Sequence, residues 1–390
     1  MPSVGRRHFG DYSPQTQAKH AILRKYFCAY VSALERNVDA FHYVDGFAGQ
    51  GTYGDDLPGS PLLAIGALTG LVKPAAVTLV EADGRAFEKL EQVITPHLAG
   101  LADSWLVHAE FEAVIDQVLA RPIYTRYRNV ATFAFIDPCG VKGVRMRDIS
   151  RLMTLRYGEC LLFWNYDGLN RWLGAVVAGS HPTERLVDFF GSRPAVDLAI
   201  ECYRASAQPR RKEIELRDLY LKALRDSTGA AFLLPFRFEA AGKARTSHYL
   251  IHCSRHPLAF RMMKDVMATA TTDFATVGVF EFLRADEIGA QSSLFRPALD
   301  NARAAILNEL RGGDRAVRTF TEKWVERPDD FLTGKLYRQE LLQMEAEDLI
   351  QVMDSRSGQL KPVNQRMKGP RPTLGPELIV RAVAGRNSAT

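Results

Sequence analysis

The chain has 390 residues and a formal net charge of +5, and 46% of its residues are hydrophobic while 24% are charged. This is the composition of an ordinary globular protein, and the length suggests one large domain with an appendage or two domains. Because no uninterrupted apolar run reaches the roughly 18 residues of a membrane span, we expect a cytoplasmic protein that does not enter a membrane.

Cysteine and histidine spacing gives little support for a metal centre. No Cys-x-x-Cys pair occurs among the five cysteines, which are Cys28, Cys139, Cys160, Cys202 and Cys253. Their scatter argues against a zinc knuckle or an iron–sulfur cluster and fits a reducing compartment. His248, His252 and His256 recur at four-residue spacing, but no carboxylate or cysteine pattern accompanies them. We therefore predict no metal site.

The first predicted element is a helix that opens at Ser13 and Pro14, since serine suits the cap of a helix and proline its first turn. Its apolar residues recur at helical spacing as far as Leu34, and Lys19 lies off that stripe.

A glycine-rich turn follows the first predicted strand. The segment Phe41–Tyr53 begins as an apolar run that ends in Asp45, and three glycines come next, at Gly46, Gly49 and Gly51. Glycine lets the backbone approach a ligand closely, so the segment predicts a cofactor loop.

The next two elements complete a strand–turn–helix–strand unit. A helix is predicted over residues 59–72, entered through Ser60 at the cap and Pro61 in the first turn, and the strand Val77–Glu81 ends in a second acid. Acids at such strand ends bond ribose hydroxyls, which favours a nucleotide-type cofactor.

Two more strands continue the alternating pattern. A short one is predicted at Trp105–His108, and the continuous apolar run 132–136 is typical of a central parallel strand buried on both faces. It ends in Asp137 and Pro138, because proline cannot continue a strand ladder. We expect the chemistry at this strand end.

A fifth strand, Cys160–Trp164, leads into a helical insertion at about residues 166–230. The insertion carries a basic cluster, either a solvated face or a phosphate-binding rim, at Arg204, Arg210, Arg211, Lys212 and Arg217. Residues 231–239 and 247–254 then predict a hairpin at one edge of the sheet.

A boundary is predicted near Gln291–Ala298. Two amphipathic helices, over residues 314–327 and 336–353, precede a turn and a short wing, so we predict a mainly helical, winged-helix-like module over residues 300–390. Its tail is typical of a nucleic-acid-binding arm or of a disordered terminus, with basic residues at Lys361, Arg366, Lys368 and Arg371.

In this order, the segments QAKHAILRKYF, YVDGFAGQGTY, GSPLLAI, LVEAD, FAFIDPCG and HYLIHCSRHPLAFRMMKDVM resemble class I S-adenosylmethionine-dependent methyltransferases. More narrowly they resemble the three-Cys-motif partner (TcmP) family, over roughly residues 14–285. The resemblance implies an α/β, Rossmann-like methyltransferase sheet within residues 1–290 and S-adenosylmethionine as the cofactor. It also implies a separate three-cysteine protein as a partner.

The resemblance also implies roles for single residues. Cofactor contacts are expected from Asp45, Gly46, Phe47, Ala48, Gly49, Gly51, Glu81, Ala82, Glu110, Phe111 and Asp137. Substrate contacts are expected from Lys19, His20, Tyr53 and Asn165. Phe111 is equally well interpreted as a core residue, and Lys19 with His20 as part of a solvated face.

Asp137 and Pro138 are the predicted catalytic pair, because a carboxylate and a carbonyl can accept hydrogen bonds from an exocyclic amine. They match the start of the [DNS]PP[YFW] motif of adenine-N6 methyltransferases, but Cys139 and Gly140 replace the second proline and the aromatic residue. A proline–cysteine pair is also similar to cytosine-C5 methyltransferases, yet their Glu-Asn-Val motif is missing. We therefore predict that Asp137, and not Cys139, carries the transfer.

Two functions stay open from the sequence. One is a methyltransferase that acts on nucleic acid or a nucleotide-type acceptor, with the basic tail and the insertion as nucleic-acid contacts. The other is a catalytically degenerate methyltransferase fold that serves as a binding partner of the three-cysteine protein.

Overall fold

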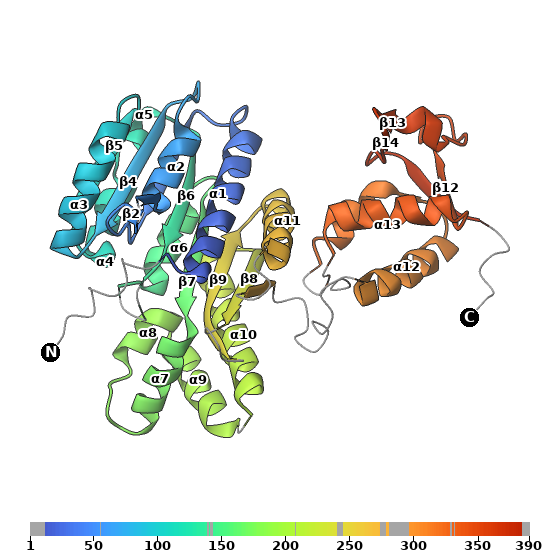
Figure 1. Cartoon of the computed structure of the whole chain (residues 1–390). Helices are drawn as coiled ribbons and strands as arrows, with labels where there is room; N and C mark the ends of the chain where they lie inside the picture. Colours follow the sequence, from blue (N-terminus) through green and yellow to red (C-terminus); the bar gives the residue numbers. More distant parts are fainter. Residues whose placement is uncertain are drawn as a thin grey trace. The chain divides into compact units, whose positions relative to one another are not determined.

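The chain divides into two compact units, Met1–Phe280 and Glu281–Thr390 (Figure 1). The computed structural model describes residues 12–54, 56–138, 140, 143–206, 208–239, 245–273, 278–280, 296–327, 330 and 332–383. The predicted boundary at residues 291–298 falls largely outside these residues. None of the described helices is both long and apolar enough to cross a membrane.

Five parallel strands form the centre of the sheet in the first unit. They are β1 (Ala40–Asp45), β4 (Ala75–Glu81), β5 (Asp103–His108), β6 (Val130–Ile136) and β7 (Glu159–Asn165). Every residue of β1 and β6 is buried, as the unbroken apolar runs of these segments predict for strands covered on both faces.

The strands are not added in one direction. Their order in the described sheet is β10-β8-β9-β7-β6-β1-β4-β5, so the chain builds outward from β1 through β4 to β5 and then returns to add β6 and β7 on the other side. Asp45 lies opposite Phe135 in the register of β1 and β6, which brings the ends of these two strands together. Ligands of open α/β sheets bind beside such a reversal.

A hairpin closes the sheet, as predicted. It consists of β8 (Phe232–Glu239) and β9 (Thr246–Ser254), with the short strand β10 (Gly278–Phe280) beside β8. β9 runs antiparallel to β7 and to β8. The predicted Rossmann-like sheet with an antiparallel edge is therefore confirmed.

Helices pack against the sheet in two groups. α1 (Pro14–Leu34) contacts α2 (Ser60–Leu68) and α11 (Pro257–Asp273). α6 (Met146–Thr154) contacts α4 (Phe111–Leu119) and the insertion. The remaining helical segments of the sheet domain are α3 (Gly84–Ile94), the 3₁₀ turn Thr95–His97 and α5 (Pro122–Arg126).

Two helix starts test the predicted caps. The Ser13 hydroxyl accepts a hydrogen bond from the Thr16 amide at 3.2 Å, so the predicted cap of α1 is confirmed. For α2 the prediction is wrong by one residue, because Gly59 is the N-cap. The Ser60 hydroxyl instead hydrogen-bonds the carboxylate of Asp45, which compensates a buried acid.

The predicted helical insertion consists of α7 (Tyr166–Val177), α8 (Glu184–Phe190), α9 (Arg193–Ala205) and α10 (Pro209–Thr228) (Figure 1). Stacked aromatic rings fix it to the sheet. Tyr220 of α10 stacks on Trp164 of β7 at 4.8 Å between centroids and on Phe189 of α8 at 4.5 Å. Trp164 in turn stacks on Tyr249 of β9 at 5.3 Å. Because α7 directly follows β7, the insertion stands at the carboxyl edge of the sheet.

The second unit has its own core and mixes helices with short strands. Its elements are α12 (Arg296–Arg311), β11 (Arg315–Ala316), the π-helix Thr319–Trp324, α13 (Gly334–Ala346), β12 (Ile350–Met353), the 3₁₀ turn Val363–Arg366, β13 (Met367–Lys368), β14 (Arg371–Pro372) and β15 (Ile379–Ala382). Three of the strands form a sheet in the order β11-β15-β12, and β13 pairs with β14.

Both helices predicted for this unit are too long. Residues 314–327 begin as a strand, because Arg315 and Ala316 pair with β15. The helix predicted over 336–353 ends at Ala346, and Asp348 takes a left-handed conformation with φ of 56°. Ile350 and Val352 are buried in β12, where β-branched side chains pack well against a sheet.

Candidate functional site

Asp45 holds the start of the glycine loop from inside the protein. Its side chain is fully buried and accepts hydrogen bonds from the Phe47 amide at 3.2 Å and the Tyr43 hydroxyl at 3.0 Å, as well as from Ser60. Burial, opposed by these hydrogen bonds, raises the pKa of Asp45 to about 7. Asp45 therefore shapes the loop and presents no carboxylate oxygen to the surface.

Glu81 fixes the far side of the same loop. Its carboxylate accepts hydrogen bonds from the amides of Gly49 and Asp83, both at 2.8 Å. Gly49 and Gly51 have φ of 62° and 83°, a region that favours glycine, so this close turn depends on these residue types. Each carboxylate oxygen of Glu81 keeps a lone pair for a further donor.

A cavity of about 560 Å³ opens at the carboxyl ends of the strands. Its lining combines predicted contacts with residues that sequence reasoning missed: Phe47, Glu81, Ala82, Asp83, Glu110, Gly140, Asn165, Gly168, Arg171, Trp172, Ala175 and His181. The volume is within the range of cavities that hold cofactors and small molecules. The missed residues from Gly168 onward belong to α7 or to the turn that follows α7 within the insertion, and no sequence pattern marks them.

The predicted residues divide into two sets. Phe47, Glu81, Ala82, Glu110 and Asn165 line the cavity. The others do not line it; they are Asp45, Gly46, Ala48, Gly49, Gly51, Phe111 and Asp137 among the expected cofactor contacts, and Lys19, His20 and Tyr53 among the expected substrate contacts.

Two of these predicted contacts have clear structural roles. Phe111 is buried in the core, and a Cβ at Gly46 would come within 3.0 Å of its ring, which explains the glycine. The side chain of Phe111 is therefore a core side chain, as the second of its two interpretations expects. Asn165 caps α7 through a 2.7 Å hydrogen bond that its side-chain oxygen accepts from the Gly168 amide.

Lys19 and Asp137 form an ion pair, although 118 residues separate them in the sequence. Both side chains are largely buried, with 8% and 17% exposed. The Lys19 ammonium also lies 4.5 Å from the centre of the Phe163 ring. The solvated-face interpretation of Lys19 is therefore wrong, because this side chain ties α1 to the end of β6.

His20 packs among aromatic rings and is 3% exposed. Its ring lies 5.6 Å from Tyr12 and 5.4 Å from Tyr53, and the Tyr12 hydroxyl is 3.3 Å from its Nδ1. Burial, together with the charge of Lys19, lowers the pKa of His20 to about 3. His20 is consequently a neutral imidazole that helps to hold Tyr12 and Tyr53.

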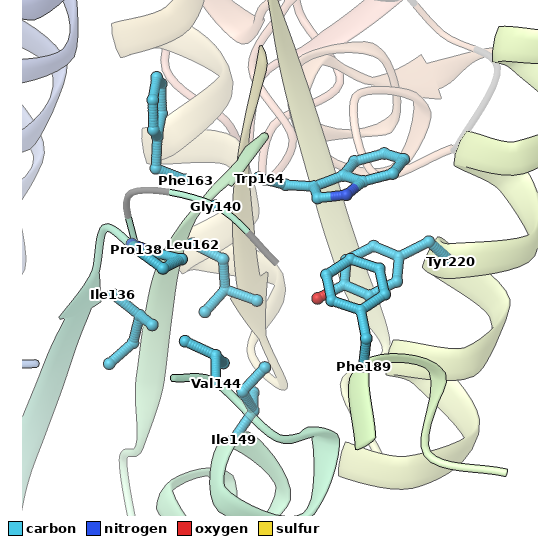
Figure 2. A pocket seen from close by; sticks show the side chains of 10 residues that line it. All are labelled: Ile136, Pro138, Gly140, Val144, Ile149, Leu162, Phe163, Trp164, Phe189 and Tyr220. Atoms are coloured by element: carbon cyan, nitrogen blue, oxygen red, sulfur yellow. The ribbon is translucent and has the colours of Figure 1, made fainter. Parts of the chain in front are cut away.

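A second, much smaller cavity borders the Asp137 strand end (Figure 2). Its volume is about 20 Å³, and Ile136, Pro138 and Gly140 line it together with the aromatic rings of Trp164, Phe189 and Tyr220. Such a volume admits one water molecule. Gly140 also lines the larger cavity, so the two hollows are neighbours. Cys139, which stands between Pro138 and Gly140 in the sequence, lies outside the described part of the chain.

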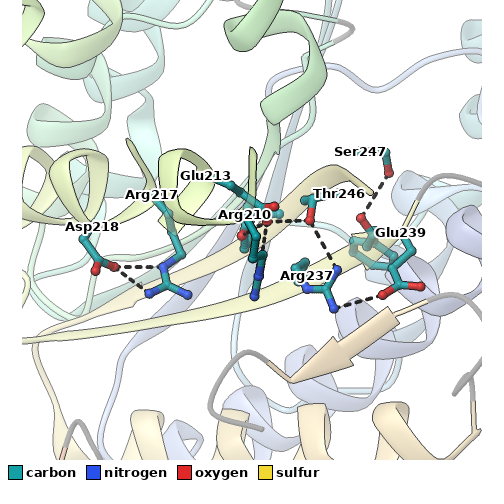
Figure 3. A network of polar contacts seen from close by, with 10 residues as sticks. Arg210, Glu213, Arg217, Asp218, Arg237, Glu239, Thr246 and Ser247 are labelled. Atoms are coloured by element: carbon teal, nitrogen blue, oxygen red, sulfur yellow. Dashed lines mark hydrogen bonds and ion pairs between the residues drawn. The ribbon is translucent and has the colours of Figure 1, made fainter. Parts of the chain in front are cut away.

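Three residues of the basic cluster of the insertion are ion-paired, and Figure 3 shows the pairs of Arg210 and Arg217. Arg210 pairs with Glu213, Arg211 with Glu215 and Arg217 with Asp218. The buried carboxylate of Glu213 also accepts hydrogen bonds from the hydroxyls of Thr246 and Tyr249, which link α10 to β9. This network supports the solvated-face and structural interpretation over a phosphate-binding rim.

The basic tail contains both structural and exposed side chains. Arg366 is 4% exposed, pairs with Glu345 and donates to the carbonyls of Lys361 and Thr373. Lys361 pairs with Asp354. Lys368 and Arg371 are exposed on the hairpin of β13 and β14 and have no ion-pair partner among the described residues.

The structure offers no candidate metal site in the residues that it describes. His252 contacts Glu159 at 3.0 Å, while His248 stacks on Phe163 at 4.6 Å. These histidines are therefore part of the packing of β9.

No protein-family model matches the chain, and no curated protein matches it by sequence. Among solved structures, it is similar to a protein from Legionella pneumophila at 12% identity and a TM-score of 0.39, over 65% of this chain and 92% of that one. A protein from Clostridium thermocellum described as an rRNA methylase is 12% identical, with a TM-score of 0.29 over 57% and 93% of the two chains. The plantazolicin methyltransferase is 12% identical, with a TM-score of 0.28 over 62% and 86%. At such TM-scores these likenesses add nothing to the fold that the strand order defines.

The raised pKa of Asp45 predicts a pH-dependent stability. Because the folded protein keeps the proton up to about pH 7, stability is lost as the pH rises from about 4 towards 7. Asp45→Asn removes this titration, so the stability of the variant relative to the wild type should rise by up to about 4 kcal/mol across that range. Urea unfolding at several pH values measures it. The control is Asp188→Asn, at an exposed position, whose profile of unfolding free energy against pH should follow that of the wild type. If the wild-type and Asp45→Asn profiles are also parallel, the prediction is contradicted.

Proposed function

We propose that the protein is an S-adenosylmethionine-dependent methyltransferase that acts on a nucleic acid or a nucleotide-type acceptor. The observation that carries the proposal is the cavity at the carboxyl ends of the strands, with Phe47, Glu81 and Glu110 in its wall. It lies at the edge of the sheet where the strand order reverses, the usual ligand position of such folds.

The residues present fit this cofactor. Glu81 offers acceptor lone pairs for ribose hydroxyls and is held rigidly by the amides of Gly49 and Asp83. Glu110 precedes α4, and its exposed carboxylate can accept from an exocyclic amine. Phe47 supplies an apolar face. The bound cofactor would supply a methyl group already activated on a sulfonium.

Asp137 is the proposed catalytic residue. It follows β6 directly, and its neighbours Pro138 and Gly140 line the small aromatic cavity beside the proposed cofactor site. A carboxylate here can accept a hydrogen bond from the acceptor's nucleophile and orient its lone pair. Lys19 acts as a positioning residue, since its ammonium holds the carboxylate in place.

The second unit supports the proposal that the methyl acceptor is a nucleic acid. The sequence of helix, strand, two helices, strand, hairpin and strand supports the winged-helix-like assignment. In that arrangement the hairpin of β13 and β14 is the wing, and its exposed Lys368 and Arg371 are suited to phosphate contacts. The insertion is a weaker candidate because Arg210, Arg211 and Arg217 of its basic cluster are ion-paired.

The ion pair between Lys19 and Asp137 favours one alternative function, that of a catalytically degenerate binding partner. Lys19 already pairs with the carboxylate, and Cys139 and Gly140 replace the second proline and the aromatic residue of the amine-methylating motif. In this alternative the protein is a degenerate methyltransferase fold that binds a three-cysteine-motif protein. Membership of the TcmP family is part of this proposal. Cofactor affinity separates the two functions, because a purely structural subunit has no need of an intact cofactor site.

Cofactor affinity should depend on Glu81. Glu81→Ala is expected to weaken the binding of S-adenosylhomocysteine by about 1.5–3 kcal/mol, the usual loss when a charged acceptor is removed. Glu81→Gln, which keeps one acceptor oxygen, should cost less, and Glu88→Ala on α3 is the matched control. Titration calorimetry measures all four proteins. The absence of binding heat and thermal shift in the wild type, with either S-adenosylmethionine or its product, would contradict the methyltransferase proposal.

Turnover should depend on Asp137. Placing one acceptor correctly contributes a rate factor of roughly 100 to 10,000, so Asp137→Ala should nearly abolish transfer while cofactor affinity stays within a few-fold. Cys139→Ser should keep most of the activity. Single-turnover transfer of labelled methyl to RNA, DNA and nucleotide pools measures both variants. Loss of activity in Cys139→Ser alone, with a covalent adduct on a 5-fluorocytosine substrate, would reverse the assignment.

Nucleic-acid affinity should depend on the exposed hairpin cations. The double variant Lys368→Ala/Arg371→Ala is expected to bind RNA or DNA more weakly and to lower the slope of log affinity against log salt by about 2, or about 0.9 for each phosphate that is no longer neutralised. Arg381→Ala is the control, because Arg381 is exposed but paired with Asp314. An unchanged slope in the double variant would show that the second unit binds nucleic acid elsewhere or not at all.

A further inference from the structure

A third cavity, of about 520 Å³, lies at the opposite edge of the sheet, away from the proposed cofactor site. It is formed where β7 begins, at Glu159, and where β9 ends, at Ser254. Tyr26, Tyr30 and Leu34 of α1 contribute one wall. Its size is within the range of small-molecule sites, and nothing in the proposed methyl transfer uses it.

The floor of this cavity is polar and built from buried groups. Glu159 is 7% exposed, and its carboxylate accepts hydrogen bonds from the hydroxyls of Tyr26 and Ser254 and contacts Nε2 of His252 at 3.0 Å. Three neighbours therefore hold the Glu159 side chain in place, and its oxygens can still accept from a ligand hydroxyl or amine.

The rim carries two cations that have no carboxylate partner among the described residues. Arg255 donates to the carbonyl of Leu155 at 2.5 Å, and the Arg156 guanidinium lies 5.3 Å from the centre of the Tyr157 ring. By contrast, Arg121 and Arg145 elsewhere in this unit each pair with an aspartate. Unpaired guanidinium groups beside a cavity are suited to a carboxylate or a phosphate.

The chain is held in an unusual shape at this rim. Tyr157 has φ of 57°, a left-handed conformation that costs free energy in a residue other than glycine. The Tyr30 hydroxyl donates to its carbonyl at 2.8 Å and stabilises this turn. The turn places Arg156 and Glu159 on the same cavity.

An apolar wall completes the cavity. Leu258 and Met262 of α11 line it beside Leu34, and the Leu258 side chain is 40% exposed. The positive end of the α11 dipole also lies here, since Leu258 is in the first turn of that helix. Cations at the rim and apolar side chains within suit a ligand that has one charged end and an apolar body.

We propose that this cavity is a second ligand site for a small organic anion, whose carboxylate or phosphate binds Arg156 and Arg255 and whose apolar body lies against Leu258 and Met262. Glu159 at the floor repels a second anionic group, so the site selects ligands with a single anionic end. α1 contacts the proposed catalytic Asp137 through Lys19 near one end and contributes Tyr30 and Leu34 to this cavity near the other.

The test uses the full chain and three probes: phenyl phosphate, phenylacetate and inorganic phosphate. None contains adenine, so none competes for the proposed cofactor site through a base. NMR titration of arginine side-chain and methionine methyl resonances should show saturable shifts at Arg156, Arg255 and Met262 with phenyl phosphate, phenylacetate or both. The probe that binds more tightly identifies the preferred anion. Inorganic phosphate should bind about tenfold more weakly, because it lacks an apolar body.

Variants separate this site from the cofactor site. Arg156→Ala/Arg255→Ala should weaken the binding of the better probe about tenfold or more, whereas Arg128→Ala, an exposed arginine outside the cavity lining, should change it less than about twofold. The double variant should keep its affinity for S-adenosylhomocysteine, and Glu81→Ala should keep its affinity for the probe. The absence of saturable shifts with either organic probe, or equal binding of inorganic phosphate, would overturn the proposal.

Discussion

Between β1 and β6 the sheet reverses the direction in which strands are added, and the proposed cofactor site lies at the carboxyl edge beside this reversal. Parallel strands end at one edge, so Asp45, Glu81 and Asp137 meet there although they come from three separate strands. The insertion after β7 then covers that edge and supplies Arg171 and Trp172 to the cavity wall.

Polar contacts that reach across the fold stabilise this edge. Asp45 and Glu81 hold the glycine loop from its two sides through backbone amides. Lys19 holds the carboxylate of Asp137 from a helix that begins the described chain. A loop and a carboxylate fixed in this way need little rearrangement to receive a ligand, which is the physical basis of preorganised sites. The third cavity is built similarly, with Tyr26, Ser254 and His252 around Glu159.

Much of the fold could be predicted because burial leaves a direct pattern in the sequence. The apolar runs of β1 and β6, and the acids that end β1 and β4, identify strands and the edge at which we propose the cofactor site. Contacts between distant segments leave no such pattern, so the sequence alone does not predict the ion pair of Lys19 with Asp137 or the insertion residues in the cavity wall.

Charge was misleading for a related reason. The sequence does not distinguish a buried arginine that pairs with a carboxylate, as Arg366 does with Glu345, from an exposed arginine that can bind a phosphate. In the second unit, Ile350 and Val352 continue a helical pattern in the sequence but form a strand, because pairing with β15 decides their conformation. Contacts with distant parts of the chain decide both the burial of Arg366 and the strand conformation of Ile350 and Val352, and a local sequence pattern does not contain these contacts.

The most direct test of this account is a crystal structure of the full chain with S-adenosylhomocysteine at saturating concentration. The account predicts ligand density in the cavity at the carboxyl ends of the strands, with a ribose hydroxyl donating to Glu81 and Phe47 against the ligand. Density in the cavity around Glu159, or an empty carboxyl edge at saturation, would contradict it.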